Sequence, residues 1–169
     1  MHGPDPAAPV AIALYQPDIP QNAGNILRLA ACLGVTAHVI EPAGFDLSDR
    51  ALRRAGMDYL AEATLVRHAA WAQFESWRVS SRQRLVLVTT HGETPYVDFR
   101  YAPGDVLLFG RESAGVPDTV HAAADARLVI PMRPGLRSVN VAAALAMVLG
   151  EALRQTGGFP GVASRPDTV

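Results

Sequence analysis

The chain of 169 residues contains one cysteine, no lysine and no long apolar run. A single cysteine, Cys32, excludes a disulfide within the chain and a zinc site built from cysteines. We expect Cys32 to be a small buried residue on a helix. No apolar stretch reaches the roughly 18 residues that a membrane-spanning helix needs, and residues 1–9 lack the positive charge of a signal peptide. These absences favour a cytoplasmic protein with no membrane partner.

Because lysine is absent, all fifteen basic side chains are arginine, and the net charge of the chain is −1. A nucleic-acid-binding protein usually carries a basic excess, so the overall charge argues mildly against one. Genomic base composition is the simplest cause of the arginine bias, but arginine also makes better bidentate contacts with phosphate than lysine does. Arg50, Arg53 and Arg54 form one of several short clusters.

Several familiar catalytic patterns are missing from the sequence. No glycine-rich dinucleotide fingerprint follows the first apolar run, and there is no phosphate-binding P-loop and no serine-hydrolase motif. The five histidines are scattered along the chain without the spacing of metal ligands. We therefore expect no metal site.

Short apolar runs alternate with helical patterns along the chain. Strands are expected over residues 10–15, 35–40, 62–66, 85–90, 105–109 and 128–130, and helices over 21–33, 48–55, 68–77, 117–124 and 138–155. This alternation predicts an α/β fold with a mostly parallel sheet and helices on both faces. It also predicts one domain over residues 10–157, between a flexible N-terminus at 1–9 and a C-terminal tail at 158–169. Trp71, Phe74 and Trp77 fall on roughly one helical face and are interpreted as core or interface residues.

A polar segment opens the first predicted helix. Gln21, Asn25 and Arg28 share one helical face at 3.6 residues per turn. Asn22 and Asn25 flank Gly24, and all three are poor helix formers crowded into one turn. This local cost indicates a role in binding a phosphate or ribose, although a solvated surface explains the same stripe.

Two more polar segments follow apolar strands late in the chain. Gly110 lets the backbone approach a ligand closely, and the carboxylate of Glu112 can accept a ligand hydrogen bond; a simple glycine turn is the alternative. Ser138 is a good helix N-cap, and Asn140 is not needed for capping. Ligands in α/β proteins sit outside the carboxyl ends of strands, so both loops are expected to line one pocket. The alanine-rich helix that follows is expected to be buried and to meet a second subunit.

Taken in order, the three segments resemble the SPOUT superfamily of RNA methyltransferases and, within it, the SpoU-type ribose 2'-O-methyltransferases. The matching motifs are residues 22–28, 107–117 and 130–144, and the resemblance covers about residues 10–162. Residues 40–45, 52–59 and 159–161 further resemble the minimal members of the family, which methylate the wobble nucleotide, cytidine or modified uridine, of leucine tRNAs. The alternatives are the same reaction on ribosomal RNA and a non-catalytic RNA-binding module.

The resemblance implies a deep trefoil knot in the C-terminal part of the sheet, a homodimer formed through the C-terminal helix, and S-adenosylmethionine bound in the knot. The residues implied for cofactor binding are Val88, Thr89, Gly110, Glu112, Ile130, Met132, Ser138, Val139 and Asn140. Arg28 matches the arginine that is thought to activate the ribose 2'-hydroxyl, and Asn25 is a second catalytic candidate. Because arginine stays protonated, we expect Arg28 to stabilise the developing alkoxide rather than to act as a base. With tRNA as the partner, the RNA-binding residues are expected to be Arg50, Arg53, Arg54, Tyr59 and His91.

Overall fold

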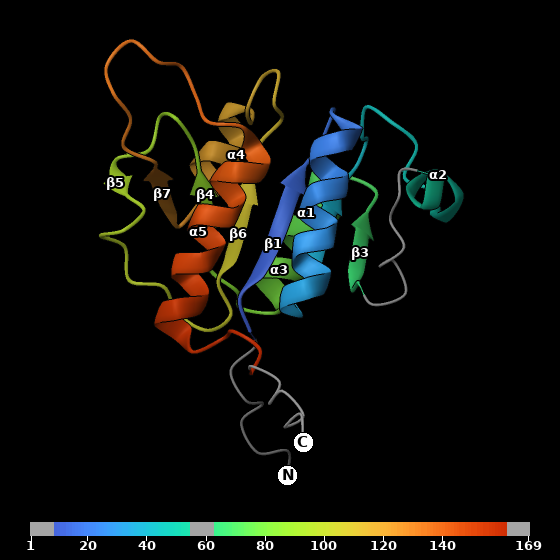
Figure 1. Cartoon of the computed structure of the whole chain (residues 1–169), viewed down its shortest axis with the longest axis horizontal. Helices are drawn as coiled ribbons and strands as arrows, with labels where there is room; N and C mark the ends of the chain where they lie inside the picture. The colour runs from blue at the N-terminus through green and yellow to red at the C-terminus, as the bar shows by residue number, and fades with distance from the viewer. Residues whose placement is uncertain (1–8, 55–62, 162–169) are drawn as a thin grey trace, which may run out of the picture.

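The computed structural model of the chain describes residues 9–54 and 63–161 and contains one seven-stranded sheet (Figure 1). The strand order is β3-β2-β1-β6-β4-β7-β5, and every pairing between neighbouring strands is parallel. The strands are β1 (Ala11–Tyr15), β2 (Ala37–Ile40), β3 (Leu65–His68), β4 (Leu85–Val88), β5 (Thr94–Pro95), β6 (Val106–Phe109) and β7 (Ala126–Val129). The predicted parallel α/β sheet is confirmed.

Helices cover both faces of this sheet, as predicted. The helices are α1 (Pro20–Leu33), α2 (Asp49–Arg54), α3 (Trp71–Ser80), α4 (Asp118–Ala123) and α5 (Val141–Thr156). In Figure 1, α1 and α5 lie side by side in front of the sheet and α3 lies behind it. Two separate clusters of buried side chains match this division, one with residues of α1 and α5 and the other with residues of α3 and α4. Among the described helices, none is long and apolar enough to cross a membrane.

The central strand β1 shows why its sequence is an unbroken apolar run. All five of its residues are buried, and they alternate between the two clusters. Ile12 and Leu14 pack toward α1 and α5, whereas Ala13 and Tyr15 pack toward α3 and α4. A strand that is covered on both faces favours an apolar side chain at every position. Each fully buried Ile or Leu contributes about 1.5–3 kcal/mol to folding.

Several elements differ from the sequence prediction, and three of the differences have a clear physical reason. The third strand extends to His68, which pairs with Ile40 of β2, so α3 begins only at Trp71. The edge strand β5 was not predicted, because a Thr-Pro pair in a loop has no apolar run to mark it. Helix α5 begins at Val141 rather than at Ser138, since Asn140 is its N-cap.

Two predictions about side-chain burial, one for Cys32 and one for the aromatic residues of α3, have opposite outcomes. Cys32 is exposed on α1, so the expectation that it is buried was wrong. It shares the exposed face of α1 with Arg28, whereas the apolar side chains of the other face contact the sheet. The interpretation of the aromatic residues of α3 as core is confirmed, because Phe74 is fully buried and Trp71 and Trp77 pack against the same cluster.

A buried pair of histidines joins β2 and β3 beneath α3. Nδ1 of His38 lies 2.9 Å from Nε2 of His68, and the His38 ring centroid lies 4.2 Å from that of Trp77. Burial, followed by the charge of His68, lowers the pKa of His38 from its usual 6.5 to about 4. Burial also lowers the pKa of His68. Both rings are therefore held neutral in the folded protein at neutral pH.

This pair predicts that the protein loses stability in mild acid. The unfolded chain binds protons at these histidines below about pH 6.5, whereas folded His38 does not until about pH 4. The contribution of the neutral pair to folding stability is therefore present above pH 6.5 and falls as the pH is lowered toward 4. The loss due to His38 is at most about 3 kcal/mol. Urea unfolding measured from pH 7.5 to 4.5 should show a steeper loss for the wild type than for His38→Phe. Substitution of the exposed His91 provides the control. An equal loss of stability with falling pH in the wild type and in His38→Phe would contradict the assignment.

Candidate functional site

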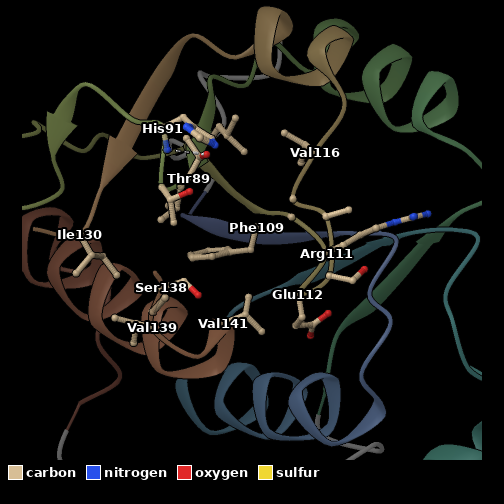
Figure 2. Close-up of a pocket in the computed structure, with 18 of the residues that line it drawn as sticks. Thr89, His91, Phe109, Arg111, Glu112, Val116, Ile130, Ser138, Val139 and Val141 are labelled. Atoms are coloured by element: carbon tan, nitrogen blue, oxygen red, sulfur yellow. Dashed lines mark hydrogen bonds between the residues drawn. The ribbon is translucent and has the colours of Figure 1, made fainter. Parts of the chain in front are cut away.

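A cavity of about 700 Å³ opens where β4 and β6 end, beside the loop that connects β7 to α5. Figure 2 shows Phe109 across its middle, between Thr89 on one side and Ser138 on the other. Every residue that the resemblance implied for cofactor binding lines this cavity: Val88, Thr89, Gly110, Glu112, Ile130, Met132, Ser138, Val139 and Asn140. The predicted RNA-binding residue His91 also lines it. The structure therefore brings the second and third motifs together.

Two glycines allow close backbone contacts near the cavity, one within the loop after β6 and one between the loop after β4 and strand β7. A Cβ on Gly110 would lie 2.6 Å from the carbonyl carbon of Gly115, where Arg111 and Gly115 form an antiparallel bridge. A Cβ on Gly92 would lie 2.4 Å from the backbone of Leu128 in β7. Contacts this short leave no room for any side chain at either position. The loop after β6 is therefore a backbone turn closed by contact between its own residues. The alternative named from the sequence, a simple glycine turn, describes only part of this loop.

A chain of side-chain amides ties the first motif to the other two. Nδ2 of Asn140 donates to Oδ1 of Asn22 over 3.0 Å, and Nδ2 of Asn22 donates to Oε1 of Glu112 over 3.3 Å. Asn22 is only 8% exposed and lies in the first turn of α1. One buried amide thus connects helix α1, the loop after β6 and the start of α5.

Asn140 also caps α5, which corrects the roles expected from the sequence. Its Oδ1 accepts hydrogen bonds from the backbone N–H groups of Ala142 and Ala143, at 2.9 and 3.3 Å. The expectation that Asn140 is not needed for capping was wrong, and Ser138 precedes the cap position. A helix N-cap contributes about 1 kcal/mol, so Asn140 serves both the helix and the cavity wall.

Glu112 lines the cavity beside a second acidic residue, Asp18. The backbone N–H of Asp18 donates to Oε2 of Glu112 over 3.3 Å, and the Ser113 hydroxyl donates to the Asp18 carboxylate. Burial, followed by the neighbouring carboxyl group of Asp18, raises the pKa of Glu112. The neighbouring carboxyl group of Glu112, followed by the hydrogen bond from Ser113, lowers the pKa of Asp18. Figure 2 shows Glu112 turned toward α1, whereas the neighbouring Arg111 points away from the cavity, where its guanidinium bonds to Gln16.

The predicted catalytic and RNA-binding residues lie mainly outside the cavity. Arg28 and Asn25 are exposed on α1, and neither lines the cavity wall. Arg50, Arg53 and Arg54 are exposed on α2, which Figure 1 places beyond β3 at the far edge of the molecule. Tyr59 lies outside the described residues. Within the described part of the chain, no group of three or more potential metal ligands occurs.

Sequence reasoning did not assign a role to two residues of this site. Asn22 was noted as a poor helix former in the first turn of its helix, and that cost was the signal of its buried position. Asp18 stands before the helix between two prolines, and no local pattern places it against Glu112, a residue 94 positions later.

The family model described as "SpoU rRNA Methylase family" matches residues 9–150. A tRNA (cytidine(34)-2'-O)-methyltransferase of Beijerinckia indica is 61% identical over 155 residues, which are 92% of this chain and 97% of that protein. The enzyme of the same name from Escherichia coli is 42% identical over 156 residues, with coverage of 91% and 98%.

Solved structures agree with these relatives. A structure described as giving insights into the 2-OH methylation of C/U34 on tRNA is 42% identical, with a TM-score of 0.81, and the match covers 88% of this chain and 97% of that one. The SpoU methyltransferase AviRb from Streptomyces viridochromogenes, solved with the cofactor AdoMet, is 28% identical with a TM-score of 0.80, covering 90% of this chain and 62% of that one. The polar cavity, the parallel sheet and these similarities lead to the same conclusion: the chain belongs to the SpoU methylase family.

Proposed function

We propose that this protein transfers a methyl group from S-adenosylmethionine to the ribose 2'-hydroxyl of nucleotide 34, the wobble nucleotide, of tRNA. The observation that carries the proposal is the meeting of the motifs around one cavity, where Asn22 joins Glu112 to Asn140. The name shared by relatives that are 61% and 42% identical supports the substrate. The chain spans nearly the whole length of both relatives.

The cavity suits the cofactor in size and in chemistry. Its volume of about 700 Å³ falls within the range of small-molecule sites. Phe109, Ile130 and Val139 supply apolar surface for a flat ring, and the backbone groups of Val88 and Gly110 lie at the ends of their strands. When bound, S-adenosylmethionine supplies a methyl group on a positively charged sulfur, and the protein's main task is to position the two reactants. We also propose that the chain around residues 130–140 forms the trefoil knot that the resemblance implies.

In this proposal, Arg28 stabilises the negative charge that develops on the 2'-oxygen as its proton leaves. Its exposed position on α1 leaves it accessible to an RNA substrate. Arginine remains protonated at physiological pH and therefore contributes charge and hydrogen bonds rather than proton abstraction. Asn25, one turn before Arg28 on the same face, is placed to bind the same ribose.

The homodimer is proposed to form through α5 and the adjoining face of α1. Ala143, Ala146 and Met147 are exposed on α5, and 42% of Met147 is accessible. Small side chains allow two helices to approach closely, and an exposed methionine on such a face is typical of an interface core. Helices α1 and α5 pack against each other, so a partner on this face would also cover the surroundings of Arg28. The cytoplasmic location stays a prediction.

We predict that the purified protein methylates nucleotide 34 of tRNA. Transfer of a tritiated methyl group to bulk tRNA, followed by mass spectrometry of nuclease fragments, should place one 2'-O-methyl group at that position in leucine tRNAs. Label found in ribosomal RNA but not in tRNA would favour the ribosomal alternative. Cofactor binding without label in either RNA would favour a non-catalytic module.

Arg28→Ala is expected to lower kcat by about a hundredfold or more, because one charge-stabilising donor is lost. The affinity for S-adenosylmethionine, measured by calorimetry, should stay within about twofold of the wild type, because Arg28 does not line the cavity. Arg28→Lys keeps the charge but not the planar fork and is the matched comparison. Loss of cofactor binding in Arg28→Ala would remove the proposed role.

Arg53→Glu is expected to weaken tRNA binding by about three- to tenfold and to reduce its dependence on salt, because a phosphate contact is lost. Arg82→Glu is the matched control, since Arg82 is exposed after α3, at the end of the sheet opposite the cavity. Filter binding at two salt concentrations compares the variants. Equal tRNA affinity for the wild type and Arg53→Glu would exclude α2 from the RNA surface.

A further inference from the structure

Arg111 is a cation at the rim of the cavity that has no acidic partner among the described residues. The residue lines the cavity, but Figure 2 shows its side chain extending away from it. Arg78 and Arg84 each form an ion pair with a carboxylate, whereas the Arg111 guanidinium forms none within the described part of the chain. The acid before α1, Asp18, accepts a hydrogen bond from Ser113 instead. The positive charge of Arg111 is therefore available to a ligand.

The guanidinium of Arg111 is nonetheless held in place by the residue that follows β1. Its Nη2 donates to Oε1 of Gln16. The backbone of Gln16 has a φ of 43°, in the left-handed region that a residue with a side chain seldom adopts, while its N–H still donates to the carbonyl of Ile40 over 2.8 Å. Such conformations are concentrated at functional sites. The turn after β1 thus presents the Gln16 amide to the guanidinium.

The Arg111 guanidinium keeps most of its hydrogen-bonding capacity. An arginine side chain has five N–H donors, and Gln16 accepts the one side-chain hydrogen bond that Arg111 makes within the described residues. The Nε–H group is buried without a partner, whereas the residue as a whole is partly exposed. The outer end of the planar fork is therefore the part that a ligand can approach. Because the fork is already oriented, little freedom is lost when it binds.

The place of Arg111 in the sheet connects the cavity with the arginine cluster of α2. The cavity opens where β4 and β6 end, and β1, β2 and β3 follow β6 in the sheet order. Arg111 and Gln16 stand directly beyond the carboxyl ends of β6 and β1. Figure 1 shows α2 beyond β3, farther along in the same direction. Arg111 therefore lies between the cavity and the surface that is expected to bind RNA.

We propose that Arg111 binds a phosphate of the RNA substrate, one of the two that flank the ribose to be methylated. The inference rests on the proposed function, because it assigns a substrate contact to the rim of the same cavity. A ribose that reaches the methyl donor must enter the mouth of the cavity, so its flanking phosphates lie just outside, where the Arg111 side chain extends. An arginine fork matches the oxygens of a phosphate. Gln16 is the positioning residue that orients the fork.

The first test is the binding of leucine tRNA that lacks the 2'-O-methyl group, measured by filter binding at several salt concentrations. Arg111→Ala should weaken binding about three- to tenfold and make the slope of log affinity against log salt shallower by about 0.7–0.9, because one phosphate contact is lost. Arg111→Lys keeps the charge but not the planar fork, so it should keep the slope and lose part of the affinity. Gln16→Ala leaves the charge in place and should do the same.

Ethylation interference identifies the phosphate that Arg111 contacts. The same tRNA is sparsely ethylated at its phosphates, and the bound and free fractions show which ethylated positions prevent binding. In the wild type, ethylation of a phosphate next to nucleotide 34 should interfere, and in Arg111→Ala this interference alone should disappear. Arg82→Ala removes an exposed arginine after α3, at the opposite end of the sheet, and should give the wild-type pattern. Loss of interference only at phosphates distant from nucleotide 34 would overturn the inference.

Cofactor affinity separates this role from a structural one. Calorimetry should give the same Kd of S-adenosylmethionine for Arg111→Ala and the wild type, because the side chain extends away from the cavity. Weaker cofactor binding in Arg111→Ala would show that Arg111 holds the loop after β6 or binds the cofactor, and would overturn the inference, as would wild-type tRNA affinity and salt slope. If the wild type methylates no tRNA while Arg111→Ala still loses one phosphate contact, the proposed function fails and the phosphate site stands.

Discussion

The buried amide of Asn22 is the contact on which the arrangement of the site depends. It accepts from the N-cap of α5 and donates to the loop after β6, so one side chain fixes the relative positions of three segments. These segments are far apart in the sequence and have no regular backbone pairing with one another. A buried amide left without either partner would lower folding stability by about 1–3 kcal/mol. Arrangements of the three segments that break a hydrogen bond of Asn22 are therefore disfavoured.

The sheet supplies the frame that makes such a contact possible. Parallel strands place the carboxyl ends of β4 and β6 at one edge, and the loops that follow turn there toward β5 and α4. Gly110 lets the loop after β6 turn against its own backbone at Gly115, and Gly92 lets the loop after β4 pass close to β7. The cavity is thus formed by backbone loops that only glycine permits, and the polar side chains are added to its walls.

Much of the fold could be predicted because buried strands leave a local mark. The apolar run of β1, the glycine that ends α1 and the alternation of elements each depend on neighbours in the sequence. Boundaries failed where a distant partner decides them: His68 belongs to β3 because it pairs with Ile40. Cys32 was placed wrongly because residue type suggests burial, whereas the helical face on which it lies determines its exposure.

The site was predictable to the extent that its motifs resemble those of a known family. That resemblance named the cofactor candidates, which the structure brings to one cavity, but it could not reveal that Asn140 is also the cap of α5. Asp18 was beyond reach for a physical reason. Its backbone N–H donates to Glu112 and its carboxylate accepts from the Ser113 hydroxyl, and such contacts between distant segments are set by the fold rather than by either residue.

Charge connects this contact to the chemistry of the proposed reaction. Methyl transfer from a sulfonium to an oxygen disperses a positive charge as the transition state forms. An ionised carboxylate on the wall of the same cavity would stabilise the charged reactant more than the transition state, and only interactions that strengthen in the transition state accelerate a step. Burial and the neighbouring Asp18 carboxyl group raise the pKa of Glu112, which lowers this cost, and Glu112 still accepts the bond from Asn22. Asp18 does not line the cavity, and in the proposed reaction Arg28 supplies positive charge where negative charge develops on the ribose. In the proposed reaction, the cavity that would hold the methyl donor and the exposed face of α1 that carries Arg28 are thus separate surfaces of one fold.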